Sequence, residues 1–415
     1  MRQKIQADVD APLPLENIYR SPSLWAWIID HHLVVATFPR AEIHVWNPTA
    51  AAIWLLLSED KKTIENIACD LHDVFQETSA NIYSDLNMCL TQWVTNQWLE
   101  VDENNYYSIH PKITESRPDS LVKTPRNNHE VIFDHSYSIS GNQFSLIISA
   151  DKESIADPFV SRLTSLADGF QHAEDRLGQE LHIIIQSGNI YVGKINSNYK
   201  KFDIPAEALN YCIQYFLSIS AGESNHFFTL HAAAIGQDNC ILLSGVSGAG
   251  KSTLCALLSL RGWKYFGDDL VGLSLNQDGE GLIVPLPSAI SVKDNNWGLI
   301  SSYYPELNTF QPVNYGEKTA RFLPLRHSEQ VQDGEKEINA IVFPRFSLNS
   351  QLSFEPISAI DALGELVTAG ISLPQEMDPA DIEIFFKFIF SVSLYRLEYS
   401  DFEEANAWLS TLVIK

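Results

Sequence analysis

The sequence predicts a multidomain chain that joins an α+β part at its N-terminus to an α/β part at its C-terminus. Three observations lead to this prediction. The 415 residues, 45% of them hydrophobic, are enough for two or three separate cores. A polar segment with several prolines, 111–130, separates two regions of different pattern. The stretch LLSGVSGAGKSTL, 242–254, joins an apolar strand to a helix of mainly apolar residues.

The composition restricts the classes of function. A formal net charge of −24 argues against a nucleic-acid or anionic-membrane partner, because such binding needs a basic face. The five cysteines show no C-x-x-C spacing, so neither a disulfide framework nor a zinc site is indicated. No stretch has the length and apolar character of a signal peptide or a membrane span. We therefore expect a cytoplasmic protein.

The first domain is expected over residues 1–110, followed by a linker over 111–130. Strand-like runs cover 24–30, 32–38 and 42–46. Asn47 before Pro48 is typical of a helix start, and apolar residues at three-and-four spacing predict two more helices over 62–75 and 79–98. Two short strands, 99–101 and 106–110, complete this domain.

The rest of the chain divides at about residue 225. Residues 131–225 are predicted to be rich in β-structure, and residues 226–415 hold the glycine-rich stretch. The elements expected before that stretch are strands at 131–139, 143–149, 181–187 and 189–195 and a helix at 206–219.

Residues 245–252, GVSGAGKS, satisfy the pattern G-x-x-x-x-G-K-[ST] of a phosphate-binding loop. Small side chains let backbone N–H groups surround a phosphate chain, and the following helix adds a partial positive charge. We expect Lys251 to reach the β- and γ-phosphates of ATP, and the hydroxyl of Ser252 to face Mg²⁺. A glycine turn that only joins strand to helix is the alternative. The residues predicted to hold the nucleotide are Gly245, Val246, Ser247, Gly248, Ala249, Gly250, Lys251, Ser252 and Thr253.

Two carboxylates, Asp268 and Asp269, follow the next strand-like stretch. Ligands of open α/β sheets bind at the carboxyl ends of strands, so both are expected beside the loop. One could hold Mg²⁺ through water while the other accepts the proton of an attacking hydroxyl. An exposed Gly-Asp-Asp turn is the alternative. His231 precedes the strand of the loop and is either a catalytic or a partly buried structural histidine.

The stretch 230–269, LHAAAIGQDNCILLSGVSGAGKSTLCALLSLRGWKYFGDD, resembles the HPr kinase/phosphorylase family. The resemblance implies a P-loop α/β domain that uses Mg-ATP to phosphorylate a serine or threonine hydroxyl. It implies that Asp268 is the acid/base residue, that Ser252 and Asp269 lie on the metal side, and that Lys251 and His231 complete the site. The glycine-rich signature of true HPr kinases has no counterpart over 285–325, which argues against HPr as substrate and against the phosphorylase reaction. Candidate contacts to phosphate or substrate are Lys293, Lys318 and Arg321.

The segment 44–75, HVWNPTAAAIWLLLSEDKKTIENIACDLHDVF, resembles the PqqD-like peptide-recognition element, a winged helix-turn-helix unit. The resemblance implies that this domain binds the leader of a ribosomally made precursor peptide as an added strand, with backbone hydrogen bonds giving affinity. We expect the leader between the strand 42–46 and the helix 81–95. The residues predicted to contact it are Glu42, Ile43, His44, Val45, Trp46, Leu86 and Leu90.

Together these features predict a kinase for a precursor peptide whose leader docks on the first domain. Two alternatives stay open. In the first, the chain is a nonenzymatic, ATP-gated escort that delivers the peptide to another modifying enzyme. In the second, a metabolic kinase is fused to a winged-helix transcriptional regulator. The absence of any basic residue from 80–98 argues against the second.

Overall fold

The computed structural model describes residues 16–38, 42–75, 79–112, 121–122, 129–151, 153–154, 157–173, 178–195, 197–221, 227–315, 318–325, 336–372 and 379–413. The chain forms two compact units. The first comprises residues 1–116, 359–367 and 373–390, and the second holds the remainder. This division differs from the predicted one, because two segments of the predicted domain 226–415 belong to the first unit.

A four-stranded antiparallel sheet with the order β1-β2-β3-β4 lies at the centre of the first unit. Alternate side chains along a strand face opposite sides of a sheet. Leu24 and Ala26 of β2 pack into the core formed with the following helices, and Trp27, which faces the other side, is also buried. The strands are β1 (Glu16–Arg20), β2 (Leu24–Ile29), β3 (His32–Thr37) and β4 (Glu42–Trp46).

Three helices and a hairpin follow this sheet, as the sequence predicts. The side chain of Asn47 accepts a hydrogen bond of 3.0 Å from the backbone N–H of Ala50, and Pro48 occupies the first turn. Trp54 and Trp93 meet edge to face in the core, with ring centroids 5.2 Å apart. The elements are α1 (Pro48–Glu59), α2 (Ile64–Phe75), α3 (Ser79–Thr95), β5 (Leu99–Val101) and β6 (Tyr107–Ile109).

Two helices from the C-terminal part of the chain complete the first unit. They are α8 (Ala359–Ala369), of which residues 359–367 belong here, and α9 (Pro379–Ser391). Phe386 of α9 packs edge to face on Trp27 at 5.2 Å, and Glu383 pairs with Arg20 at 2.9 Å. Residues more than 300 positions away therefore pack on the face of β2 that α1–α3 leave uncovered.

The second unit begins with a seven-stranded sheet of the order β10-β8-β9-β11-β12-β13-β7. Val122, within the predicted linker, pairs with Tyr199 and so belongs to this sheet, whereas 113–120 and 123–128 lie outside the described residues. The elements are β7 (Leu121–Val122), β8 (Glu130–Ile139), β9 (Asn142–Ala150), α4 (Pro158–Ala167), β10 (Gln171–His172), β11 (Gln179–Gln186), β12 (Asn189–Gly193), β13 (Tyr199–Phe202) and α5 (Pro205–Ala221).

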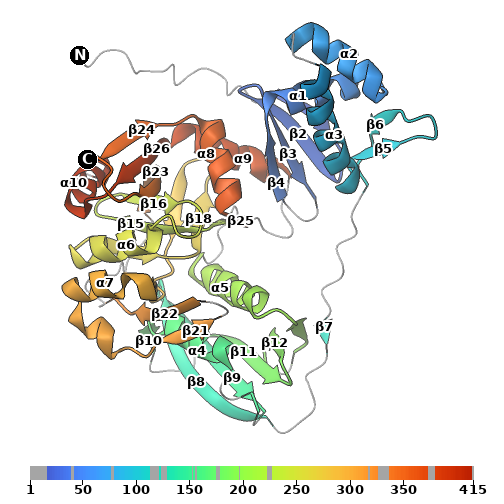
Figure 1. The fold of residues 1–415 in the computed structure, drawn as a ribbon. Coiled ribbons are helices and arrows are strands. Elements are labelled where there is room, and N and C mark those ends of the chain that lie inside the picture. The colour runs from blue at the N-terminus through green and yellow to red at the C-terminus, as the bar shows by residue number, and fades with distance from the viewer. Residues whose placement is uncertain are drawn as a thin grey trace. The chain divides into compact units, whose positions relative to one another are not determined.

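A ten-stranded mixed sheet forms the other part of this unit, and α5 packs against strands of both sheets (Figure 1). The order β17-β15-β16-β23 places β16 in its interior, and β23 runs parallel to β16. The strands are β14 (Phe227–Leu230), β15 (Ala232–Gly236), β16 (Cys240–Ser244), β17 (Lys264–Gly267), β18 (Val271–Leu275), β19 (Gly281–Val284), β23 (Lys336–Phe346), β24 (Ser353–Pro356), β25 (Ile371–Ser372) and β26 (Ser393–Tyr399).

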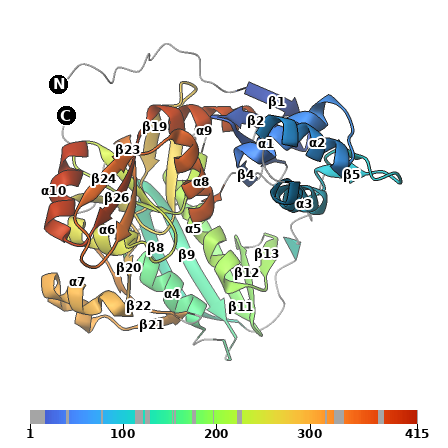
Figure 2. The same ribbon diagram turned by 45° about the horizontal axis from the view of Figure 1, so that its top comes forward.

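A small three-stranded sheet with the order β20-β22-β21 lies beside α6, together with α7 (Figure 2). These elements are α6 (Lys251–Leu260), β20 (Ile290–Lys293), α7 (Trp297–Tyr303), β21 (Val313–Tyr315) and β22 (Lys318–Leu323). Helix α10 (Phe402–Val413) packs on β16, β23 and β26. In the part of the chain that the structure describes, no helix is both long enough and apolar enough to cross a membrane.

Gly169, just after α4, gives a first testable prediction about this packing. A Cβ atom at Gly169 would lie 2.3 Å from the backbone N of Ala289 and 2.5 Å from the carbonyl oxygen of Pro287. Because backbone cannot move aside as a flexible side chain does, we expect Gly169→Ala to lower the free energy of unfolding by about 1–3 kcal/mol. Thermal and urea unfolding measure this loss. Gly298→Ala in α7 is the control, since its added Cβ meets nothing within 4 Å. Equal stability of the two variants would contradict the prediction.

Candidate functional site

The glycine-rich loop connects the buried strand β16 to the N-terminus of α6. Gly245, Gly248 and Gly250 have φ angles of 141°, 94° and 97°, in the left-handed region that glycine tolerates best. Gly250 occupies the cap position of α6 without a side-chain hydrogen bond to the helix. The first N–H groups of α6 therefore need partners, and an anion at this end could provide them.

Lys251 is buried inside the loop that precedes it. Only 6% of the residue is exposed, and its ammonium donates hydrogen bonds to the carbonyl oxygens of Gly245 at 2.5 Å and Val246 at 3.3 Å. Burial lowers the pKa of Lys251. The loop thus holds a cation at its centre, where the charge of a phosphate chain would compensate the cost of burial.

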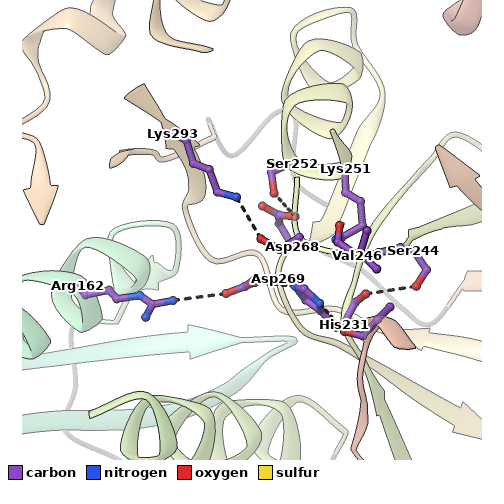
Figure 3. A network of polar contacts seen from close by, with 12 residues as sticks. Arg162, His231, Ser244, Val246, Lys251, Ser252, Asp268, Asp269 and Lys293 are labelled. Carbon is purple, nitrogen blue, oxygen red and sulfur yellow. Dashed lines mark hydrogen bonds and ion pairs between the residues drawn. The ribbon is translucent and has the colours of Figure 1, made fainter. Parts of the chain in front are cut away.

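The two adjacent hydroxyls at the start of α6 have different partners. Ser252 donates a hydrogen bond of 3.1 Å to Asp268 Oδ1 (Figure 3). The hydroxyl of Thr253 instead accepts a hydrogen bond of 2.9 Å from the side-chain amide of Asn296. Ser252 is therefore the hydroxyl that contacts a carboxylate, that of Asp268.

Asp269 lies between two cationic side chains, whereas the side chain of its neighbour Asp268 contacts Ser252. His231 Nε2 lies 3.2 Å from Asp269 Oδ1, and Arg162 Nη2 lies 3.7 Å from Asp269 Oδ2 (Figure 3). The other ring nitrogen of His231, Nδ1, lies 2.8 Å from the carbonyl oxygen of Ala369. Both partners of the ring accept hydrogen bonds, an arrangement that favours the doubly protonated imidazolium, and the hydrogen bond with Asp269 raises the pKa of His231.

The environments of the two carboxyl groups push their pKa values apart. Burial and the nearby Asp269 raise the pKa of Asp268 to about 6. Burial acts in the same direction on Asp269, but the hydrogen bond from His231 and the charges of His231 and Arg162 outweigh it and lower its pKa. At neutral pH Asp269 is held ionised, whereas Asp268 can exchange a proton. Such a divergence is typical of sites with separate acid/base and electrostatic roles.

These side chains line one pocket of about 640 Å³ in the second unit. Lys293 and Lys318, two of the candidate contacts to phosphate or substrate, lie at its wall, and Lys293 donates to Ser247 at 3.5 Å. The prediction for Arg321 is wrong. Its guanidinium lies 4.1 Å from the ring centroid of Trp297 and bonds to Asn308. Lys318 and Arg321 are an odd number of residues apart on β22, so their side chains leave opposite faces.

The donor atoms in this pocket fit Mg²⁺ that arrives with a phosphate chain. Within the described residues, no group of three or more His, Cys, Asp or Glu side chains could hold a metal ion by itself. Mg²⁺ is commonly bound through one or two carboxylates together with substrate phosphates. Ser252, Asp268 and Asp269 supply only oxygen atoms, and the buried Asp268 Oδ2 has no hydrogen-bond partner in the described chain. The set therefore suits a hard, oxygen-seeking cation.

The raised pKa of Asp268 predicts a pH-dependent gain in stability for Asp268→Asn. Between about pH 4 and 6 the folded protein holds a proton on Asp268 that the unfolded chain has lost. The free energy of unfolding therefore falls as the pH rises through this range. Without nucleotide and metal, we expect the variant to be more stable at pH 7.5 by up to about 3 kcal/mol, and to lose this advantage below pH 4. Urea unfolding at both pH values measures this, and a gain that is independent of pH would contradict it.

The residues predicted to contact a leader peptide divide into two groups. Glu42, His44, Val45 and Trp46 of β4 retain exposed surface, and β4 is the last strand of its sheet among the described residues. Ile43 is 7% exposed. The predictions for Leu86 and Leu90 are wrong, because both are buried in the core of the first unit beneath α3. Their helical spacing is that of a face packed into the core. A face that binds a peptide needs the same spacing of apolar residues, so the sequence pattern could not distinguish the two.

Several residues of the pocket were not predicted from the sequence, among them the polar residues Arg162 and Asn296. Arg162 comes from α4, in a region to which no motif assigned a role, and Asn296 follows β20. Asp157 before Pro158, with Phe159 and Leu163 four residues apart, was the signal that could have revealed α4. Neither Arg162 nor Asn296 itself belongs to a recognisable sequence pattern.

Comparison with known proteins identifies one part of the chain. No curated protein matches it. The solved structure of the Hpr(Ser) kinase/phosphatase from Coxiella burnetii is similar at 14% identity, and the match covers 45% of this chain and 93% of that one. Its TM-score of 0.21 is too low to support a structural argument. Residues 34–99 match the family of coenzyme PQQ synthesis protein D (PqqD). The PqqD-like domain predicted from the sequence is thus confirmed: these residues form a PqqD domain.

Proposed function

We propose that the chain is a Mg²⁺- and ATP-dependent kinase that phosphorylates a serine or threonine hydroxyl of a ribosomally made precursor peptide. The observation that carries this proposal is the contact between Ser252, at the start of α6, and Asp268, in the pocket that also holds Lys251. This contact joins a phosphate-binding loop to a carboxyl group whose pKa lies near neutrality. A kinase needs both parts within reach of the same γ-phosphate.

In the proposed reaction the peptide hydroxyl oxygen bonds to the γ-phosphorus of ATP. The bond between that phosphorus and the β,γ-bridging oxygen breaks, ADP leaves, and the hydroxyl proton passes to Asp268. Lys251 and the loop N–H groups hold the phosphates, and Lys293 and Lys318 add positive charge at the pocket wall. Ser252 and Asp269 would hold Mg²⁺, which neutralises charge on the phosphates.

The PqqD domain supports a peptide as the substrate. We propose that a leader peptide adds as a strand to β4, whose outer edge is unpaired among the described residues. Tethering the leader raises the effective concentration of the distal hydroxyl near the pocket, so the acceptor site itself can bind weakly.

The test uses a short peptide encoded beside the gene, with and without its N-terminal half. We expect the purified protein and Mg-ATP to add one phosphoryl group to the complete peptide, as measured by mass spectrometry. Removing the leader half should raise the KM for peptide by about 100-fold or more and leave kcat similar, because only the tether is lost. A peptide with the leader sequence scrambled is the control. Equal KM values for complete and leaderless peptide would contradict leader docking.

The escort function remains the second candidate, because the same loop would bind nucleotide in a protein that only delivers the peptide. It predicts ATP binding without any phosphopeptide. ADP release with the peptide left unmodified, under conditions where leader binding is shown by fluorescence anisotropy, would favour the escort over the kinase.

A further inference from the structure

Arg162 reaches the pocket from outside the ten-stranded sheet that carries the loop. Helix α4 begins at Pro158, where Asp157 accepts a hydrogen bond of 2.8 Å from the backbone N–H of Phe159. Phe159 and Leu163 are buried in the core beneath the seven-stranded sheet. Arg162 lies at the edge of this buried face, and 23% of its side chain is exposed. The core therefore fixes the point from which its guanidinium extends (Figure 3).

Asp269 is held from both sides by cations on elements that are distant in sequence. His231 follows β14, in the sheet of the glycine-rich loop, and contacts Oδ1. Arg162 approaches Oδ2 from α4. We call His231 and Arg162 the Asp269 clamp. Because the two cations lie beside different oxygens, both favour this orientation of the carboxylate as well as its ionised form.

The backbone at Asp269 adopts a left-handed conformation. Its φ angle is 71°, in a region that is uncommon for residues other than glycine, although aspartate adopts it more often than most. The side chain of Asp269 lies beside His231 and Arg162, whereas that of Asp268 bonds to Ser252. A strained residue persists only where its surroundings hold it, and such residues concentrate at functional sites.

We infer that Arg162 is a positioning residue for phosphoryl transfer, which acts by orienting Asp269 together with His231. The inference rests on the proposed function and gives the region 131–225 a part in the active site. Groups that orient a metal-binding carboxylate typically change activity by 10- to 100-fold when they are removed. The ion pair that Arg162 forms is with Asp269, which lies outside the glycine-rich loop. Removing the side chain of Arg162 should therefore affect kcat more than the affinity for nucleotide.

The first experiment compares Arg162→Ala and Arg162→Lys with the natural protein. We expect Arg162→Ala to lower kcat by about 10- to 100-fold with the KM for ATP changed by less than about threefold. Arg162→Lys, or guanidinium added to Arg162→Ala at concentrations that leave the fold intact, should restore part of the rate. Arg396→Ala removes an exposed arginine–carboxylate pair outside the pocket and is the matched control.

In the Asp269→Asn background, removing Arg162 should have no further effect on kcat. The inference would be overturned if Arg162→Ala left kcat unchanged, or if removing Arg162 lowered kcat equally in the natural protein and in Asp269→Asn.

The second experiment needs no catalysis. A double-mutant cycle of urea unfolding for Arg162→Ala and Asp269→Asn, without nucleotide or metal, should show coupling, because the two side chains meet in the free protein. If the effects of the two substitutions on the free energy of unfolding simply add, Arg162 does not orient Asp269, even if the protein is a kinase. Coupling in a protein that phosphorylates no peptide would instead refute the proposed function and leave the clamp standing.

Discussion

Asp268→Asn is expected to reduce phosphoryl transfer on the order of 10³-fold while ATP still binds. Asparagine keeps the oxygen that accepts the hydrogen bond from Ser252, but it cannot take a proton from the attacking hydroxyl. Because Lys251 and the loop N–H groups are unchanged, the Kd for ATP should differ by less than about threefold. Single-turnover transfer to the peptide and calorimetric titration with a nonhydrolysable ATP analogue measure the two effects.

Asp269→Asn is the matched comparison for this prediction. If Asp269 lies on the metal side, its loss should be partly restored by raising the Mg²⁺ concentration, whereas Asp268→Asn should not respond. The opposite pattern would exchange the proposed roles of the two carboxyl groups. Transfer at the natural rate in Asp268→Asn would exclude Asp268 as the acid/base residue.

Lys251→Ala is expected to reduce kcat/KM for ATP by at least about 10²–10³-fold. The ammonium of Lys251 lies among the loop carbonyls and brings a full positive charge to the pocket, where little water competes with it. Lys264→Ala, which removes an exposed lysine at the start of β17, is the control for a general effect of lost charge. Nucleotide titration and transfer assays measure the change.

Lys251 also bonds to Gly245 and Val246, so its loss could disturb the loop itself. Thermal unfolding without ligand separates this effect from lost binding, since a disturbed fold lowers the melting temperature before any nucleotide is added. A Lys251→Ala variant that binds and uses ATP like the natural protein would contradict the assignment of the loop as the phosphate site.

Local patterns predicted much of the site because its chemistry depends on short segments. The spacing from Gly245 to Ser252 specifies a strand, a turn with left-handed glycines and a helix N-terminus, all of which the structure contains. The strand end at Asp268 was predicted in the same way. Which carboxylate contacts which partner was not predictable, because the partners come from other elements of the fold.

Errors arose where one pattern has two structural outcomes. Leu86 and Leu90 have the spacing of a helix face, and a buried core and a peptide groove require the same apolar residues. Arg321 lies in the same short strand as Lys318, but the strand register places it against Trp297 instead of the pocket.

The sequence by itself determined the elements whose causes are local: the start of α1 at Asn47 and Pro48, the glycine-rich loop, and the PqqD domain. Only the tertiary structure decided that α9 covers β2 through Phe386 and Trp27, and that Arg162 faces Asp269. The physical reason is the range of the interactions. Caps and turns are formed between neighbours in the chain, whereas burial and ion pairing act between any surfaces that the fold brings together.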